Sequence, residues 1–124
     1  MADLTFNAED KTFFPTKHHG DVWLLKQKWE KICKEPERLH FKHNTEKIAT
    51  TLINPDYVRR SKTYKNQLIY YKEFDKIKLN DRVEILAKKQ YRFWAVVIDE
   101  VTQRLWTLYP TEKPKPGFEF KPKV

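Results

Sequence analysis

The stretch that decides the fold is Arg92–Asp99, RFWAVVID, in which every residue from Phe93 to Ile98 is apolar. A run of this length that is apolar on both faces is typical of a strand in the middle of a sheet, where both sides are covered. The following stretch, Gln103–Tyr109 or QRLWTLY, alternates between two sets of side chains and predicts a neighbouring strand. The C-terminal part of the chain is therefore expected to build a β-sheet.

Two segments ahead of the central stretch have the same character. Gln67–Phe74, QLIYYKEF, and Arg82–Lys88, RVEILAK, are rich in aliphatic and aromatic residues, and each has the length of a strand. A short strand is also expected near Tyr57–Ser61. Together these segments predict a mainly antiparallel sheet of about four to five strands.

The first half of the chain has helical periodicity instead. Over Asp21–Lys34, apolar side chains recur at three- and four-residue spacing with lysines between them, which predicts an amphipathic helix capped by Asp21 and ended by Pro36. A second helix is expected over Thr45–Ile53, followed by the turn NPD at residues 54–56. Helices first and strands after them indicate an α+β fold, with the N-terminal helices packed on one face of the sheet.

The length of 124 residues fits one compact domain, 1–124. Residues 1–19 are expected to form an extended N-terminal arm, and residues 111–124 a C-terminal tail rich in Pro and Lys. The single cysteine, Cys33, has no internal disulfide partner. No segment has the pattern of a signal peptide or the roughly 20 apolar residues of a membrane span. A cytoplasmic protein without a membrane partner is expected.

The charge balance of the chain is basic, because 25 Lys and Arg against 17 acids give a formal net charge of +8. Such a surplus favours a polyanionic partner, which is RNA, DNA or an acidic protein. In Tyr57–Lys65, YVRRSKTYK, cations stand between tyrosines, and this combination binds unpaired nucleic acid through phosphates and base faces. The two glycines are too few for a Gly-rich nucleotide loop, so no cofactor is expected.

Two histidines, His40 and His43, stand in Arg38–Glu46, RLHFKHNTE, just ahead of the second expected helix. No CxxC or HExxH spacing accompanies them, so no metal site is expected, and Ser61, the only serine, lacks the surroundings of a serine nucleophile. Histidine among cations fits metal-independent RNA cleavage, which uses a base, an acid and cations that stabilise the phosphorane. The residue types for this chemistry are present as His40, His43, Arg59, Arg60, Lys62, Lys72, Tyr70, Tyr71, Thr107 and Tyr109. The alternative is that the histidines occupy an ordinary surface turn and the tyrosines ordinary strands.

Four stretches in a fixed order carry a family resemblance. They are HFKHNTEKIATTLINPDYVRRS from His40, LIYYKEF from Leu68, FWAVVIDE from Phe93 and LWTLYPTEKPKPG from Leu105. Over roughly residues 38–117 the chain resembles the phage and bacterial members of the barnase/EndoU/colicin/RelE-like nuclease superfamily. The resemblance implies two helices packed against a four-stranded antiparallel sheet, with RNA in the open cleft of the sheet.

The chain also departs from the pattern of this superfamily. Asn44 stands where the family often has Pro, which affects the register of the histidines. The segment Lys76–Gln90 is longer than usual and suggests an inserted strand or hairpin.

The resemblance assigns roles by position. His40 falls on the leading histidine of the family and is expected to act as general base or acid. A cation from Arg59, Arg60 or Lys72 is expected to assist it. Thr107 and Tyr109 fall on the closing strand and share one of its faces. With the basic stretch included, the expected substrate-binding residues are His43, Ser61, Lys62, Tyr64, Tyr70, Tyr71 and Lys72.

Three functions follow as hypotheses. The leading one is a small metal-independent endoribonuclease, a toxin-like or mobile-element protein restrained by an acidic inhibitor or antitoxin. The second is a non-catalytic RNA- or DNA-binding module that uses YVRRSKTYK and the aromatic side chains of the sheet. The third is a protein-interaction domain whose basic face binds an acidic protein.

Overall fold

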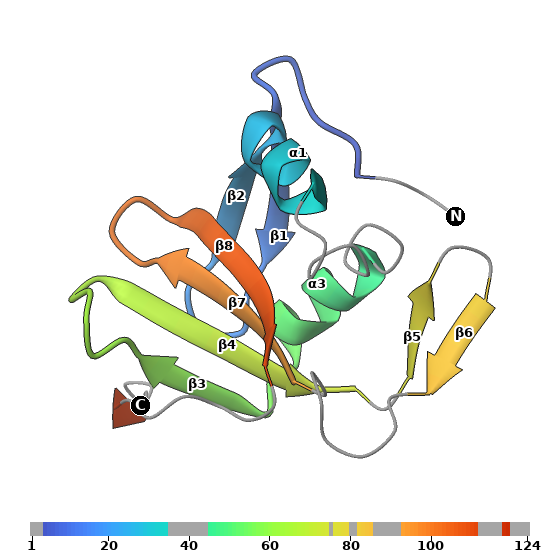
Figure 1. Ribbon diagram of the computed structural model, residues 1–124. Coiled ribbons are helices and arrows are strands. Elements are labelled where there is room, and N and C mark those ends of the chain that lie inside the picture. The colour runs from blue at the N-terminus through green and yellow to red at the C-terminus, as the bar shows by residue number, and fades with distance from the viewer. Residues whose placement is uncertain are drawn as a thin grey trace.

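The computed structural model describes residues 4–34, 45–74, 76–79, 82–85, 93–111 and 118–119, and these ranges form the predicted α+β fold (Figure 1). The helices within them are α1 (Lys26–Lys34) and α3 (Thr45–Ile53). The strands within them are β1 (Lys11–Pro15), β2 (Asp21–Leu25), β3 (Tyr57–Arg60), β4 (Gln67–Glu73), β5 (Lys76–Leu79), β6 (Arg82–Ile85), β7 (Phe93–Asp99), β8 (Arg104–Thr111) and β9 (Phe118–Glu119). Seven of the described strands join one sheet in the order β1-β2-β8-β7-β4-β3-β9.

The central strand of the sheet is β7, as RFWAVVID predicts. It pairs antiparallel with β8 on one side and with β4 on the other. Trp94, Val96 and Ile98 project from one of its faces and are fully buried. Ala95 and Val97 project from the opposite face and are also buried. Both faces of β7 are therefore covered.

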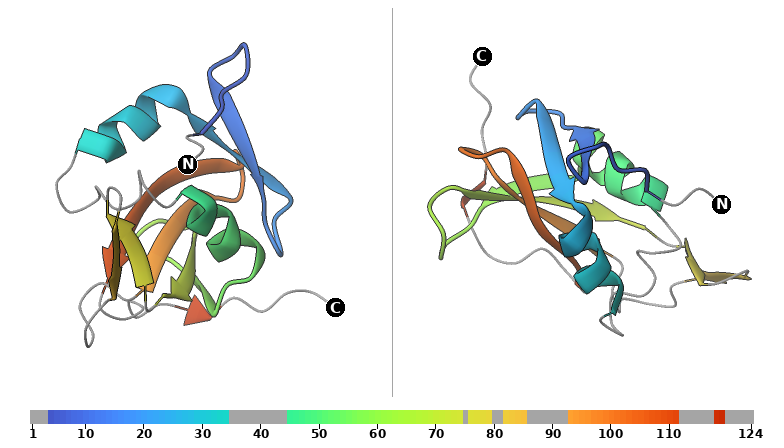
Figure 2. Two further views of the ribbon diagram at one scale, coloured as in Figure 1. Left: turned by 90° about the vertical axis from the view of Figure 1, so that its right-hand side faces the viewer. Right: turned by 90° about the horizontal axis from the view of Figure 1, so that it is seen from above.

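The helix α3 covers the face from which Trp94 projects. It spans the predicted range, and its Ile48 and Leu52 are fully buried in the same core cluster as Trp94. It contacts β1, β4 and β7, and we call this side of the sheet the helix face (Figure 2). The other helix, α1, buries Trp29 and Ile32 and contacts β2 and β8. That α1 shares the helix face with α3 stays a prediction.

The N-terminal segment differs from the prediction, because Asp21–Leu25 is the strand β2 and α1 begins only after it. The strand β2 pairs with β1, so part of the expected extended arm is a hairpin that adds two strands to the sheet. Val22 and Leu24 are fully buried and alternate with Trp23, a period of two that the helical spacing of the segment concealed. The hairpin turns at Gly20, whose φ of +66° is left-handed and favours glycine. The prediction of about four to five strands is therefore too low.

A separate hairpin lies between β4 and β7 in the sequence. The strands β5 and β6 pair antiparallel as a separate two-stranded sheet, so the strand or hairpin expected in Lys76–Gln90 is present. The strand expected over Arg82–Lys88 includes β6, which does not join the main sheet as predicted. Near the C-terminus, β9 pairs with β3 at the edge of the main sheet. Within the described ranges the one parallel pair is β2 with β8, where Trp23 lies opposite Arg104. The main sheet is otherwise antiparallel, as expected.

Candidate functional site

Cross-strand rows of side chains build the face of the sheet opposite α3. Thr107 of β8 lies opposite Val97 of β7, and Val97 lies opposite Ile69 of β4. Directly opposed residues of neighbouring strands project to the same side. Because Val97 alternates with Val96 and Ile98 of the helix face, this row lies on the other side. We call that side the pocket face.

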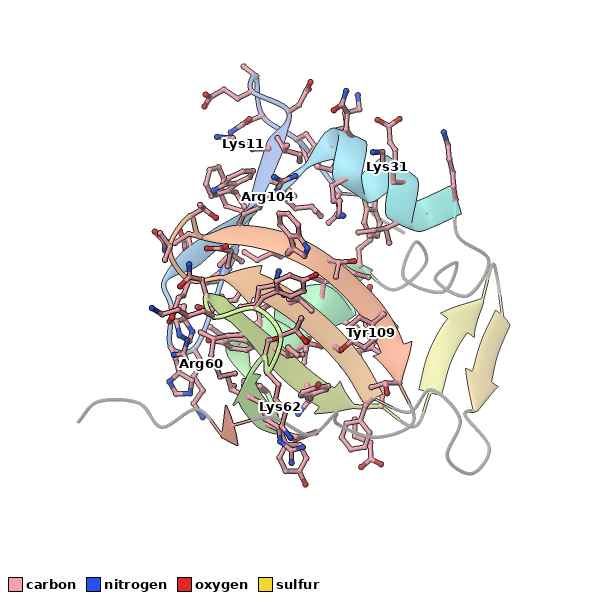
Figure 3. All side chains as sticks on the ribbon, turned by 60° about the vertical axis from the view of Figure 1, so that its left-hand side comes forward. Lys11, Lys31, Arg60, Lys62, Arg104 and Tyr109 are labelled. Carbon is pink, nitrogen blue, oxygen red and sulfur yellow. The ribbon has the colours of Figure 1, made fainter. Side chains whose placement is uncertain are left out.

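A pocket of about 310 Å³ opens on the pocket face. Ile69, Val97 and Thr107 contribute to its lining from three adjacent strands. The predicted site residues Ser61, Lys62, Tyr64, Thr107 and Tyr109 all line it, together with Gln67 and Trp106. In Figure 3, Tyr109 is labelled on β8 and Lys62 near the turn that follows β3. Residues from the basic stretch and from the closing strand are thus brought together.

A β-bulge in β8 shapes one rim of the pocket. Thr107 lies opposite Val97 and Leu105 lies opposite Ile98, so Trp106 is an extra residue on β8. Trp106 is 43% exposed and lines the pocket next to Thr107. The bulge therefore places two consecutive side chains at the pocket, where a regular strand would direct them to opposite faces.

The opposite rim is the turn between β3 and β4. Ser61 Oγ accepts hydrogen bonds from the backbone N–H groups of Thr63 and Tyr64 at 3.1 and 3.2 Å. The backbone N–H of Gln67 donates to the carbonyl of Tyr64 at 3.1 Å, which closes the turn. Ser61 therefore holds the rim together. Lys62 and Tyr64, whose ring is 60% exposed, supply its charge and its aromatic surface.

The two arginines of β3 lie on opposite sides of the sheet. Arg59 is paired with Ile69 and belongs to the pocket face. Arg60 is paired with Leu68 and belongs to the helix face, where it donates a hydrogen bond to Glu100 Oε1 at 2.6 Å. Of the two, only Arg59 shares a face with Thr107 and Tyr109.

The predicted residues of β4 are divided in the same way. Tyr71 lies in the cross-strand row of Tyr109 on the pocket face, and it is fully buried. Tyr70 and Lys72 project to the helix face. Lys72 Nζ lies there 3.5 Å from Asp56 Oδ1. Tyr70 and Lys72 therefore lie away from the pocket.

The two histidines of RLHFKHNTE, His40 and His43, lie outside the described residues. No family model matches the chain, and no curated protein or solved structure matches it. Among the residues that the structure describes, no three His, Cys, Asp or Glu side chains gather closely enough to hold a metal ion. The described helices include none with the length and apolar character needed to cross a membrane.

Sequence reasoning missed a histidine cluster on the helix face. The hydroxyl of Tyr70 lies 2.6 Å from His19 Nδ1 and accepts the backbone N–H of His18 at 3.3 Å. On the other side of the ring, His19 Nε2 lies 3.9 Å from Glu100 Oε2. The second carboxylate oxygen of Glu100 is the one that accepts the hydrogen bond from Arg60. The cluster joins the β1–β2 turn to β3, β4 and the β7–β8 turn.

Burial shifts the pKa values of two groups in this cluster. It lowers the pKa of His19 below the ordinary value of 6.5, an effect that the Glu100 carboxylate opposes and that His18 and Arg60 reinforce. Burial also raises the pKa of the Tyr70 hydroxyl above its ordinary 10.0, although hydrogen bonds from Thr16 and His18 oppose this. When the Tyr70 hydroxyl donates to His19 Nδ1, a neutral imidazole carries its proton on Nε2, toward Glu100. The only sequence signal for the cluster was a histidine pair next to Gly20.

Proposed function

We propose that the protein is a metal-independent endoribonuclease that binds RNA on the pocket face. The observation that carries the proposal is the convergence of Lys62, Tyr64, Thr107 and Tyr109 in one pocket. These side chains supply a cation, an exposed aromatic ring and hydroxyl donors, which phosphodiester cleavage uses beside a base and an acid. The net charge of +8 favours association with a polyanion.

The rims of the pocket favour an unpaired strand. Tyr64 and Trp106 stand on opposite rims and are 60% and 43% exposed, so each offers a ring face on which a base can stack. Lys62 also lines the pocket, and Arg59 projects to the same face of the sheet. Both cations are suited to contact phosphates of the strand.

The reaction balances with groups of the chain and of the RNA. A base takes the proton of the 2′-hydroxyl, and the 2′-oxygen attacks the adjacent phosphorus. The bond from phosphorus to the 5′-oxygen breaks, and an acid gives this oxygen a proton, which leaves a 2′,3′-cyclic phosphate and a 5′-hydroxyl end. In this scheme Thr107 and Tyr109 donate hydrogen bonds to the phosphate oxygens, and Lys62 offsets the charge of the phosphorane. We assign the base or acid role to His40 on the family resemblance.

A second candidate function is RNA or DNA binding without cleavage. It is favoured by the described lining of the pocket, in which hydroxyl, amide, aromatic and lysine side chains are present and no histidine is. We also propose that the endoribonuclease is a cytoplasmic toxin-like protein whose activity is blocked by an acidic inhibitor protein. A carboxylate-rich surface of the inhibitor would compete with RNA for the same cations.

The test is incubation of the purified protein with end-labelled single-stranded RNA in the presence of EDTA. We expect fragments that end in a 2′,3′-cyclic phosphate, and none from an oligonucleotide with 2′-deoxyribose throughout. His40→Ala and Lys62→Gln should each reduce the rate. Uncleaved RNA in a salt-sensitive complex would select the binding module instead. If RNA is neither cleaved nor bound, both candidate functions are wrong.

A further inference from the structure

A series of contacts between cations and aromatic rings lies beside the pocket. Lys11 Nζ is 4.6 Å from the centroid of the Trp23 ring, and the guanidinium carbon of Arg104 is 5.5 Å from the same ring. This carbon is also 5.1 Å from the ring of Trp106, and Lys28 Nζ lies 5.6 Å from that ring. We call Lys11, Trp23, Arg104, Trp106 and Lys28 the cation–aromatic ladder.

The register of the sheet makes the ladder continuous with the pocket. Trp23 of β2 lies opposite Arg104 of β8, and Arg104 lies opposite Asp99 of β7. Asp99 in turn lies opposite Gln67 of β4, which lines the pocket. The row therefore belongs to the pocket face. Trp106 belongs to both the ladder and the pocket lining, and Arg104 and Tyr109 are labelled along β8 in Figure 3.

The charge of Arg104 has no counter-ion in the ladder. Its Nε is shielded from solvent and has no hydrogen-bond partner among the described residues. The neighbouring carboxylate in the row, Asp99, instead accepts the backbone N–H groups of Val101 and Thr102 at 2.9 and 3.0 Å. An arginine in contact with two indole rings keeps its charge, and a planar guanidinium is well suited to bind an anion such as a phosphate.

Two exposed rings lie along this face of the sheet. Trp106 is 43% exposed, and Phe13, which lies opposite Trp23 in β1, is 51% exposed. Exposed rings that alternate with cations form the combination that holds unpaired nucleic acid, by stacking of bases and neutralisation of phosphates. A duplex fits this surface less well, because its base faces are already stacked.

We propose that the cation–aromatic ladder is a track for an unpaired RNA strand that extends beyond the pocket. Phosphates of the strand contact Arg104, Lys28 and Lys11, and bases stack on Trp106 and Phe13. The inference rests on the proposed function for the identity of the nucleic acid, but binding alone tests it. An acidic protein would match the cations, yet it would leave the exposed rings without the planar partners that bases provide.

The first measurement is the dissociation constant of non-cleavable 2′-O-methyl oligonucleotides of about 4 and about 12 nucleotides, lengths within the range of single-strand sites. The wild-type protein should bind the longer one more tightly. Trp106→Ala should weaken its binding by about 5- to 150-fold, the effect of losing one stacked base. Trp106→Phe should retain most of the affinity, because the ring face is kept. Because Trp106 also lines the pocket, the short oligonucleotide should lose affinity in Trp106→Ala as well.

A matched pair of lysines provides the control. Lys28 stacks on Trp106 in the ladder, and Lys47 of α3 lies 5.0 Å from the Phe74 ring, which packs against the core of the helix face. Lys28→Ala should lower the salt slope of binding by about 0.7, the value for one phosphate contact on a single strand. Lys47→Ala removes the same charge and should leave the slope unchanged.

The outcomes separate the ladder from the proposed function. If length-dependent binding depends on Trp106 and Lys28 but wild-type protein cleaves no RNA, the ladder stands and the endoribonuclease proposal fails. If RNA is cleaved while Trp106→Ala and Lys28→Ala bind both oligonucleotides like wild type, the ladder is overturned. The ladder is also overturned if the wild-type protein binds both oligonucleotides with equal affinity, or if it binds neither of them.

Discussion

Arg59 and Arg60 are consecutive residues of β3 whose side chains belong to opposite faces of the sheet. The guanidinium carbon of Arg59 lies 5.2 Å from the Tyr57 ring on the pocket face. Arg60 is bound to Glu100 at 2.6 Å on the helix face. In the sequence the two arginines look equivalent, but in the structure Arg59 lies on the face proposed to bind RNA and Arg60 forms an ion pair on the helix face. They form a matched pair that separates RNA binding from stability.

Arg59→Gln is expected to lower the salt slope of RNA binding by about 0.7, because one phosphate contact is lost. Its free energy of unfolding should change by less than about 0.5 kcal/mol, as for other surface substitutions. Arg60→Gln should do the reverse and lower the free energy of unfolding by roughly 1 kcal/mol, since a partly exposed ion pair is removed. Filter binding at several salt concentrations and urea unfolding measure the two quantities. Equal effects of the two variants on RNA binding would contradict the assignment of faces.

Tyr109→Phe is expected to reduce kcat by about 100-fold with a smaller change in KM, because in the proposed mechanism it removes a hydrogen-bond donor to the developing charge. Tyr57→Phe is the control, since Tyr57 lies in the same cross-strand row but not in the pocket lining. Steady-state cleavage of a labelled RNA measures both variants. A loss of activity in Tyr57→Phe as large as in Tyr109→Phe would show that the pocket is not where the hydroxyl acts.

The elements that sequence reasoning predicted well are those specified by local signals. The helix α3 has its expected range because the turn NPD ends it and Ile48 and Leu52 repeat at helical spacing. The strand β7 was predictable because a short run that is apolar on both faces and bounded by polar residues is typical of a central strand. Thr107 and Tyr109 were placed on one face by their spacing of two, and both line the pocket.

The remaining features depend on partners distant in the sequence. Asp21–Leu25 fits a helix or a strand locally, and its pairing with β1 and β8 decides for the strand. The faces of Arg59 and Arg60 follow from the register of β3 on β4, where a shift of one residue would exchange them. The bulge at Trp106 likewise has no signature in QRLWTLY, although it determines what lies at the pocket rim.

Gly20→Ala is expected to lower the free energy of unfolding by about 1–2 kcal/mol, the cost of a left-handed conformation for a residue with a Cβ. Gly20 has a φ of +66°, and an added Cβ would lie 3.4 Å from Gln103 Nε2, which is ordinary contact, so backbone strain is the main effect. Gln103 Nε2 donates to the carbonyls of His19 and Asp21 at 2.9 and 3.1 Å, which ties this turn to the β7–β8 turn. Thermal unfolding measures the change. An unchanged melting temperature would show that the turn adapts to alanine without strain.

The histidine cluster should make stability depend on pH, and the direction follows from its environment. Burial lowers the pKa of His19 in the folded chain below its ordinary 6.5. As the pH falls below about 6.5, the unfolded chain therefore binds more protons than the folded chain. The contribution of His19 is therefore undiminished above about pH 6.5 and is lost as the pH falls toward the folded pKa. Among the described residues, the titratable and charged groups that act on the ring include Tyr70, Glu100, Arg60 and His18.

His19→Asn tests this dependence, because its side-chain oxygen can accept the Tyr70 hydroxyl in place of Nδ1 and the residue does not titrate. Urea unfolding between about pH 8 and pH 5 should show wild type losing stability below about pH 6.5, with a smaller loss in His19→Asn. At about pH 8 the variant should be the less stable of the two, since it loses the packing of the imidazole. An identical acid loss in both proteins would assign the pH dependence to other groups. Because the cluster lies on the helix face, His19→Asn should leave RNA binding by the folded protein unchanged.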